Sequence, residues 1–395
     1  MPVFAPCWED CKSAERREKK VEYLELIYDL IFVYVIGRNN ALLHHLENGF
    51  VSGSTFLAYT MFSLAVIQIW NFSTFYINMH GRNSLRDHIA LLLNMYLLYY
   101  IGTSTRLHFE SFPYQYHIAW AIILINIAAQ YAIELRNHRG KQAEENSIRK
   151  MMVVLFGEAA LVLICIPFYS RLGTGLAGIP IFYGIVMTLT FSDENKAELI
   201  DFAHLSERAM LYVVFTFGEM IIAIAGYFDG EFSLNSAYFS AASFLIVVGL
   251  FLSYEVLYDS IIDRGKKTTG IRYFIIHIFL IFAMNSITAS LEFMRNESVR
   301  LWPKILFLLG AFLLYFFCLF ALQSYAKPEL RICRRFVIPI IGITLGFIAG
   351  MLLLRENMRL NILLSVLYVF AVFWRIWLYS RQNERGMQER REKKV

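Results

Sequence analysis

Acidic residues inside long apolar stretches are the first feature of this sequence that could do chemistry. In residues 22–43, Glu22, Glu25 and Asp29 are spaced i, i+3 and i+7, so they share one face of a helix. Asp29 lies about 12 Å along such a helix, at 1.5 Å per residue, which is too deep to reach water easily. A charge at that depth inside a membrane is costly, so this carboxylate needs either a partner on another segment or a functional role.

A second apolar stretch, residues 205–227, contains Glu207, Arg208 and Glu219. Arg208 and Glu219 are about 16 Å apart along a helix axis, so they cannot pair directly, although they can face one cavity or one helix seam. Gly218, immediately before Glu219, is expected to let a neighbouring helix approach closely.

The Gly-Glu step recurs in residues 150–169, where Glu158 lies about as deep as Asp29 does in its own stretch. Three acids facing lipid separately would each cost roughly 2.5–3.5 kcal/mol on insertion scales. We therefore predict that Asp29, Glu158, Arg208 and Glu219 form one buried polar cluster that can change its protonation state. The candidate proton or substrate site comprises Glu25, Asp29, Glu158, Glu207, Arg208 and Glu219.

Other ionisable residues are secondary candidates. Arg38 lies about 180° around the helix from Asp29 and cannot pair with it there. Arg86 and His277 complete this second group. Glu134 lies within about a turn of a predicted cytoplasmic end and is interpreted as a side chain that extends to the interface. The alternative for all of these charges is a purely structural role in helix packing.

The composition indicates a polytopic membrane protein. Of 395 residues, 57% are apolar, 16% are aromatic and only 17% are charged. A soluble domain usually contains about 25% charged residues, and a disordered chain contains more. The unbroken apolar runs also exclude a transmembrane β-barrel, whose strands alternate in polarity. The net charge of +5 is spread over short clusters, so no nucleic-acid partner is predicted.

The fold class predicted from these runs is an all-α integral membrane protein with about twelve transmembrane helices. The predicted spans are residues 22–43, 55–77, 88–105, 116–135, 150–169, 174–192, 205–227, 235–258, 272–293, 303–323, 336–354 and 360–379. With both termini cytoplasmic, 27 basic residues fall in inner segments and 7 in outer loops. This is the asymmetry that the positive-inside rule expects.

The spacing of the spans predicts two halves, and one interpretation is a parallel repeat of six helices related by a shift of about 184 residues. Regular helix spacing alone is the alternative explanation. The predicted segments are a cytoplasmic tail (1–20), a first half (21–192), a short cytoplasmic linker (193–203), a second half (204–380) and a basic cytoplasmic tail (381–395).

Three motifs resemble the bacterial low temperature requirement protein A (LtrA) family. Residues 24–33, LELIYDLIFV, resemble the family's opening ELFFDLVFV-type signature. The segment containing His204, Glu207-Arg208 and Gly218-Glu219 resembles its H-x-x-ER…GE signature. The end of the second span looks similar through Asn71, Tyr76, Asn78 and Arg82, whereas Arg38 departs from the family pattern. The resemblance implies a multi-pass protein of the bacterial plasma membrane and supplies no catalytic or ligand residues.

We expect a proton- or ion-coupled secondary transporter, because the sequence combines many membrane spans with buried acidic residues and has almost no extramembrane domain. Its expected partners are the lipid bilayer and an unidentified small molecule or ion, and its oligomeric state stays open. No catalytic, cofactor-binding or metal-ligating residue and no cofactor is predicted, since no P-loop, GxGxxG or HExxH motif occurs. The alternatives are a non-transporting stress or cold-adaptation factor and a membrane-embedded enzyme acting on lipid.

Overall fold

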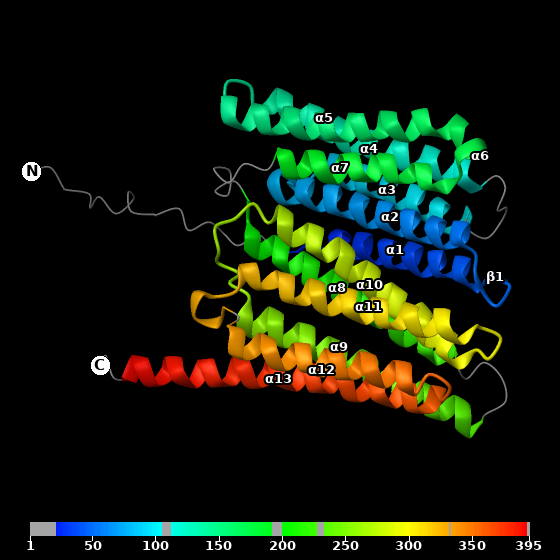
Figure 1. The fold of residues 1–395 in the computed structure, drawn as a ribbon. Helices are drawn as coiled ribbons and strands as arrows, with labels where there is room; N and C mark the ends of the chain where they lie inside the picture. The colour runs from blue at the N-terminus through cyan, green and yellow to red at the C-terminus, as the bar shows by residue number, and fades with distance from the viewer. Residues whose placement is uncertain (1–20, 105–111, 192–199, 227–232, 332, 393–395) are drawn as a thin grey trace, which may run out of the picture.

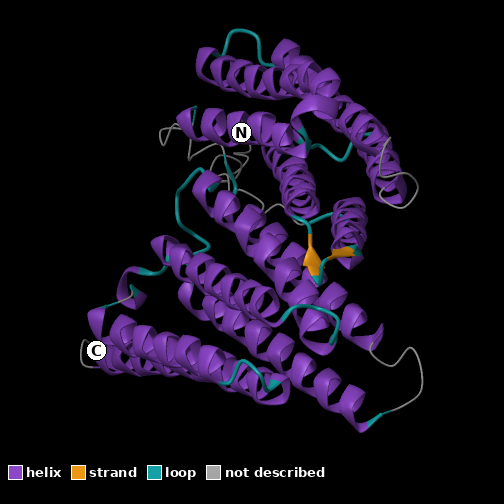
Figure 2. Ribbon diagram, turned by 45° about the vertical axis from the view of Figure 1, so that its right-hand side comes forward, coloured by secondary structure: helices purple, strands orange, loops and turns teal. Residues whose placement is uncertain are grey.

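Long helices lying side by side form almost the whole structure. The computed structural model describes residues 21–104, 112–191, 200–226, 233–331 and 333–392. Long apolar runs adopt helices in a membrane because a helix satisfies its backbone hydrogen bonds internally. Figure 2 shows one small pair of strands among the helices of the described ranges.

Twelve long helices follow one another along the described residues. They are α1 (Tyr23–Asn40), α2 (Gly53–His80), α3 (Leu85–Ser104), α4 (Phe112–Asn137), α5 (Gln142–Cys165), α7 (Gly178–Thr190), α8 (Phe202–Ala225), α9 (Leu234–Val256), α10 (Ile271–Arg295), α11 (Leu301–Ala321), α12 (Arg334–Leu353) and α13 (Met358–Glu392).

Short elements connect some of these helices. The helical ones are η1 (Ala41–His44), η2 (Ile166–Phe168), α6 (Tyr169–Leu172), η3 (Thr174–Ala177), η6 (Leu257–Ile261), η7 (Leu322–Tyr325) and η8 (Pro328–Leu330). Strands β1 (Leu46–Glu47) and β2 (Phe50–Val51) form an antiparallel pair, with Leu46 opposite Val51 and Glu47 opposite Phe50.

The prediction of an all-α multi-span membrane protein is confirmed. Each of the twelve predicted spans coincides with one of the long helices, and 10 helices in the described part of the chain are long and apolar enough to cross a membrane. The other two predicted spans correspond to α3 and α7. Helix α7 falls short in length, because together with the turn before it the apolar helical segment covers only Thr174–Thr190. Helix α3 has Arg86 and Asp87 in its first turn.

The two predicted halves lie in different parts of the bundle. In Figure 1, helices α1 to α7 lie together above helices α8 to α13. The two groups meet where α1 and α2 contact α8 and α10. We call this contact region the seam. Helix α1 begins, and helix α13 ends, at the same end of the bundle, which we call the termini end; the β1–β2 pair lies at the far end.

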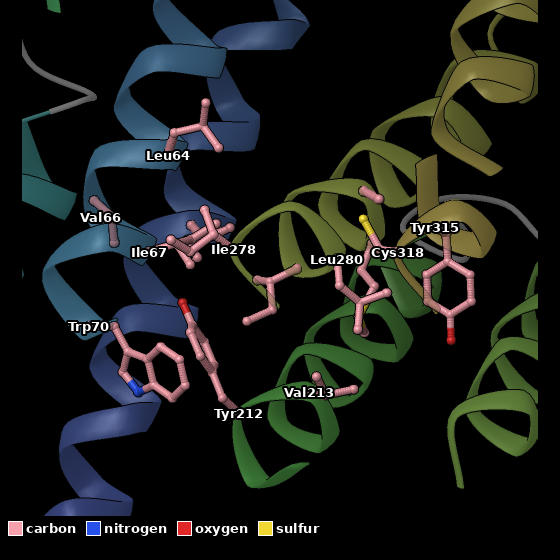
Figure 3. Close-up of a cluster of buried hydrophobic side chains, with 14 of the residues drawn as sticks. Leu64, Val66, Ile67, Trp70, Tyr212, Val213, Ile278, Leu280, Tyr315 and Cys318 are labelled. Carbon is pink, nitrogen blue, oxygen red and sulfur yellow. The ribbon is translucent and has the colours of Figure 1, made fainter. Parts of the chain in front are cut away.

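Aromatic and aliphatic side chains fill the seam. Figure 3 shows Ile67 and Trp70 of α2 beside Tyr212 of α8 and Ile278 of α10. The rings of Trp70 and Tyr212 have centroids 4.5 Å apart, and Trp70 also stacks on Phe274 of α10 at 5.2 Å. Contacts of this kind are worth about 0.5–1.5 kcal/mol each beyond the burial of area. This packing surrounds the polar residues of the seam with aromatic and aliphatic side chains.

Candidate functional site

A buried ion pair joins α1 to α8 within the seam. Arg208 Nη2 lies 2.5 Å from Asp29 Oδ1, and the side chains of both residues are 0% exposed. The Trp70 indole nitrogen donates a second hydrogen bond to the same Asp29 oxygen at 2.8 Å. Charge-assisted bonds of this type are about twice as strong as neutral ones. The sequence-based prediction that Asp29 and Arg208 come together is therefore confirmed, and each satisfies the need of the other for a partner.

Glu25 and His204 extend this pair by one helical turn. Arg208 Nη1 lies 3.4 Å and His204 Nε2 lies 3.5 Å from Glu25 Oε2. The other ring nitrogen of His204 is 2.9 Å from Asn78 Nδ2 of α2, and Asn78 also donates to the Asp201 carbonyl at 2.9 Å. We define the seam cluster as Glu25, Asp29, Trp70, Asn78, His204 and Arg208.

The seam cluster has spare hydrogen-bonding capacity. Asp29 Oδ2, Arg208 Nε and Arg208 Nη1 have no hydrogen-bond partner among the described residues, although Nη1 keeps its ion pair with Glu25. The hydroxyl of Tyr212, whose ring packs on Trp70, has none either among these residues. Buried polar atoms normally have a protein or water partner, so atoms such as these indicate places for water or a bound ligand. Two carboxylates also face a single guanidinium, which leaves an excess of negative charge unless His204 or one acid is protonated.

A chain of neutral polar groups lies beside the seam cluster in the first half. The Tyr28 hydroxyl, one residue before Asp29, lies 2.7 Å from the Ser73 hydroxyl and accepts a weak bond from Asn94 at 3.5 Å. Asn126 of α4 donates to the Asn94 side chain at 2.8 Å. These contacts position α1 against α2, α3 and α4 through neutral hydroxyl and amide groups.

Glu158 of α5 forms a separate site on the opposite side of α2. Its side chain is fully buried, and Gln68 Nε2 lies 3.3 Å from its Oε2. The same amide nitrogen lies 3.3 Å from the Ile181 carbonyl of α7. Glu158 Oε1 and Gln68 Oε1 have no hydrogen-bond partner among the described residues. A Cβ at Gly184 would collide with Glu158 Oε2 and Gln68 Nε2, so this glycine makes room for the pair.

The prediction of one cluster is therefore wrong for Glu158. Gln68 and Trp70 are two residues apart on α2, which is about 200° around a helix. Gln68 faces α5 and α7, whereas Trp70 faces α1 and α8. Helix α2 separates Glu158 from Asp29, although both acids lie at a similar depth in their predicted spans.

The same prediction is also wrong for Glu219. Within the described ranges, Arg208 forms its ion pairs with Glu25 and Asp29, and not with Glu219. Glu219 is partly buried and its carboxylate lies over Gly37 of α1, where a Cβ would collide with Glu219 Oε1. The expected role of Gly218 is wrong as well, since Gly218 is exposed and a Cβ there would meet nothing within 4 Å. The close helix approach occurs at Gly37 instead.

The remaining candidates lie outside both sites. Glu207 is partly buried and close enough to Tyr258 to interact with it electrostatically. Arg38 is partly buried in the last turn of α1. His277 is buried, with its two ring nitrogens 2.8 Å from the Tyr273 carbonyl and 3.1 Å from the Tyr254 hydroxyl. Both nitrogens of His277 are therefore occupied by packing contacts.

Arg86 belongs to a charged network at the termini end. Its Nη2 lies 2.6 Å from Glu134 Oε1 and 3.2 Å from the Tyr76 hydroxyl, and it also pairs with Asp87 at 3.1 Å. Arg82 Nη2 is 3.2 Å from the other Glu134 oxygen. The side chain of Glu134 is 0% exposed, so the expectation that it extends to the interface is wrong. Arg82 and Arg86 instead extend to this acid, and these ion pairs join the start of α3 to the last turn of α4.

One group of side chains near this network has the composition of a metal site. Candidate ligand atoms of His80, Glu134 and His138 lie within 4.8 Å of one another. Both Glu134 oxygens already accept bonds from arginines, and His138 Nδ1 lies 2.9 Å from the Glu134 carbonyl. His138 Nε2 is 3.4 Å from Glu144 of α5. These groups hold the ends of α2, α4 and α5 together, and a cation would have to displace an arginine from Glu134.

Several site residues escaped the sequence-based candidate list. Trp70 and Gln68 lie in an apolar span and carry no charge. The one signal in the sequence that could have identified them is a polar group deep inside a span. Asn78 and His204 appeared only through the resemblance to a family signature. The structure places the two motif residues Asn78 and His204 in direct contact, and Trp70, which belongs to no motif, donates a hydrogen bond to the motif residue Asp29.

Comparison with known protein families places the chain beside one of them. The model of the family described as bacterial low temperature requirement A protein (LtrA) matches residues 20–372 of the chain. No curated protein and no solved structure matches it. The matched region contains all of the seam cluster and also Gln68 and Glu158.

Proposed function

Because the chain belongs to the bacterial low temperature requirement A (LtrA) family and is a multi-pass membrane protein, we propose that it is a proton- or ion-coupled secondary transporter of the plasma membrane. The observation that carries the proposal is the buried Asp29–Arg208 pair between the two halves. Substrate and ion sites of secondary transporters lie near the membrane midplane where two repeats meet. Transport is preferred to catalysis, since neither buried site combines an acid with a nucleophile.

Parallel packing of α1 and α8 supports a two-fold arrangement of the halves. Asp29 and Arg208 are separated by 179 residues in sequence, and Glu25 and His204 have the same separation. A constant separation means that the two helices run in parallel and in register at the seam. A parallel repeat with its axis along the membrane normal produces this pairing.

A tyrosine hydroxyl joins the fourth long helix to the second in each half. The Tyr116 hydroxyl of α4 donates to the Phe62 carbonyl of α2 at 2.6 Å. The Tyr315 hydroxyl of α11 donates to the Leu250 carbonyl of α9 at 2.8 Å. Helices α4 and α2 are the fourth and second of the first half, and α11 and α9 are the fourth and second of the second half. The two contacts join corresponding helices but lie at different depths, since Tyr116 is four residues from the start of α4 and Tyr315 is fourteen residues from the start of α11.

In this proposal the seam cluster couples protonation to movement of the halves. Protonation of Asp29 removes one charge of the buried pair, so Arg208 is left with Glu25 and the link between α1 and α8 weakens. A buried pair that loses one partner is unstable by several kcal/mol, which is enough to change the relative position of two rigid halves. The spare atoms of Asp29 and Arg208 then become available to a substrate or to water.

Glu158 is the second group that could exchange an ion. Its described neighbour is a neutral amide, and no basic side chain pairs with it among the described residues. Four oxygen atoms (two from Glu158, the Gln68 amide oxygen and the Ile181 carbonyl) are of the kind that accept a proton or a hard cation. Proton or cation binding there would be sensed by α5 and α7 of the first half only.

Proteoliposomes containing the pH dye pyranine test the proposal without knowledge of the substrate. Solutes of several classes, namely amino acids, dicarboxylates, sugars, nucleosides and monovalent cations, are added outside under an imposed potential. We expect at least one class to change the internal pH in a manner abolished by a protonophore. Asp29→Asn and Glu158→Gln should lose this response, whereas the control Glu292→Gln, a half-exposed acid of α10, should keep it.

Different outcomes separate the alternatives. A folded, inserted protein that moves no protons with any solute class contradicts coupled transport. Conversion of the liposome lipid instead would indicate an enzyme. A protein with neither activity, whose variants differ only in thermal stability, would mean that the buried charges only specify helix packing.

A further inference from the structure

A cavity of about 930 Å³ lies at the far end of the second half. It is bounded by the start of α9, the connection between α10 and α11, and the connection between α12 and α13. Cavities of roughly 300–1,000 Å³ are typical of small-molecule sites. The cavity is distinct from the seam cluster and from Glu158, and a ligand can bind there whether or not the protein is a transporter.

Basic side chains predominate on the wall of this cavity. The charged lining residues are Arg295, Arg300, Lys304 and Arg359, against Glu297 and Glu356. The wall therefore has an excess of positive charge, which concentrates anions in a concave, partly apolar space. Neutral solutes and cations gain nothing from this distribution.

Lys304 is the most informative of these residues. It is only 4% exposed, and its ammonium donates to the Asn296 carbonyl at 3.2 Å. Glu297 is close enough to interact with it electrostatically, but no carboxylate oxygen lies within 4 Å of Lys304 Nζ in the described ranges. A buried ammonium without a close counter-ion is costly. A carboxylate or phosphate supplied from outside would complete its coordination.

Two helix N-termini add to the positive potential. Helix α11 begins at Leu301, and its N-cap residue Arg300 makes no side-chain capping bond. Helix α13 begins at Met358, which also lines the cavity, although Asn357 Oδ1 already accepts a bond from the Leu360 N–H of its first turn at 3.1 Å. The free N–H groups and the dipole of a helix N-terminus favour bound anions. Here this effect acts together with the buried ammonium and the three arginines.

We propose that this cavity binds a small anion bearing carboxylate or phosphate groups, with Lys304 as the buried anchor and Arg300 and Arg359 as the outer contacts. The same chemistry is presented by a free solute and by a phospholipid headgroup from the adjoining leaflet. The volume of the cavity accommodates either.

Thermal unfolding of the purified full-length chain in a neutral detergent tests this site. Inorganic phosphate, succinate and a short-chain phosphatidylglycerol are compared with chloride at equal ionic strength. We expect stabilisation by phosphate or succinate if the ligand is a free solute, and by the lipid alone if it is a headgroup. Lys304→Met should weaken the apparent affinity at least about tenfold, as expected for a lost charge-assisted bond.

Exposed variants keep the test decisive if Lys304→Met does not fold. Arg300→Gln and Arg359→Gln should each weaken binding without loss of folding, because both side chains are exposed. The control Arg355→Gln should bind as the wild type does, since Arg355 stacks on Trp302 at 4.8 Å and does not line the cavity. No stabilisation beyond that of chloride, or equal binding by the wild type and all three cavity variants, would overturn the proposal.

Discussion

Asp29 and Arg208 meet at the same height on two parallel helices, each six residues after the first residue of its helix. Neither side chain is exposed, so their 2.5 Å contact replaces the water that each charge loses. Because α1 opens the first half and α8 opens the second, this contact is also an electrostatic link between the halves. Its strength therefore bears on both stability and the proposed movement.

Removal of Arg208 alone should destabilise the protein more than neutralisation of Asp29. Arg208→Met leaves two buried carboxylates facing each other, and breaking a buried pair in this way costs about 3–5 kcal/mol. Asp29→Asn keeps an oxygen for Trp70 and leaves Arg208 paired with Glu25, so its melting temperature should fall less. Fluorescence-detected size-exclusion chromatography after heating measures both variants.

The double variant Asp29→Leu with Arg208→Met provides the matched comparison. It removes both charges of the pair but leaves the buried Glu25 without its arginine, so only part of the lost stability should return. Lys141→Met removes one partner of an exposed pair and should change stability by less than about 1 kcal/mol. A double variant less stable than Arg208→Met alone would show that the two charges are not coupled.

The Trp70 indole should stabilise the protein through its hydrogen bond as well as its ring. Trp70→Phe keeps an aromatic ring against Tyr212 and Phe274 but removes the donor to Asp29 Oδ1. The loss of a bond to a charged group predicts a destabilisation of about 1.5–3 kcal/mol. Trp302→Phe, at a half-exposed position, is the control and should have little effect in the same thermal assay. Equal effects at both positions would argue against this bond.

Gly37 should tolerate a methyl group only if Glu219 is shortened. A Cβ at Gly37 collides with Glu219 Oε1, so Gly37→Ala should lower the melting temperature or the yield of folded protein. Gly37→Ala combined with Glu219→Ala should recover it, because the obstructing carboxylate is absent. Gly218→Ala has open space and is expected to be neutral. Failure of the double variant to recover would place the strain elsewhere.

Much of the fold follows from the sequence because the membrane leaves few alternatives. Unbroken apolar runs had to be helices, and the basic residues between them predicted the side of the membrane on which each loop lies. The predicted spans coincide with the long helices for this reason. Two of these helices, α3 and α7, are not among the 10 that are long and apolar enough to cross a membrane. Helix α3 begins with charged residues, and helix α7 is shortened by the turn that starts at Thr174. Neither feature alters the position of the helix in the bundle.

The site was only partly predictable because depth and partner are different properties. The spacing of Glu25 and Asp29 gave the helix face, and Arg208 was the natural partner for both. Depth alone suggested that Glu158 belonged with them. Gln68 and Trp70, however, point in different directions around α2, so Glu158 and Asp29 contact opposite sides of this helix. The side that each acid contacts depends on which helices pack together, and one sequence without contacts does not contain that information.

The distribution of basic residues predicts the side of the membrane on which each loop lies. Asn48 lies in the turn between β1 and β2 at the far end, and Lys141 lies between α4 and α5. Reporter fusions at these positions should be outside and inside the cell, respectively. Both termini would then be cytoplasmic. Fusions that report the same side at both positions would contradict this orientation.

Access of water to the seam cluster from each side of the membrane tests the account most directly. Thr74 is buried one turn from Trp70 on the same face of α2, and its hydroxyl has no hydrogen-bond partner among the described residues. In a background without the native cysteines, Thr74→Cys is treated with a membrane-impermeant thiol reagent in right-side-out and in inside-out vesicles. Ser243→Cys, buried in α9 away from the seam, is the control and should stay unmodified.

A coupled transporter opens its central site to one side at a time, so the Thr74→Cys protein should be modified in both vesicle preparations. Asp29→Asn should change the ratio of the two modification rates, because it weakens the link between the halves. Modification of Thr74→Cys in neither preparation, with rates as low as those of Ser243→Cys, would contradict transport through the seam and leave Asp29 and Arg208 with a structural role.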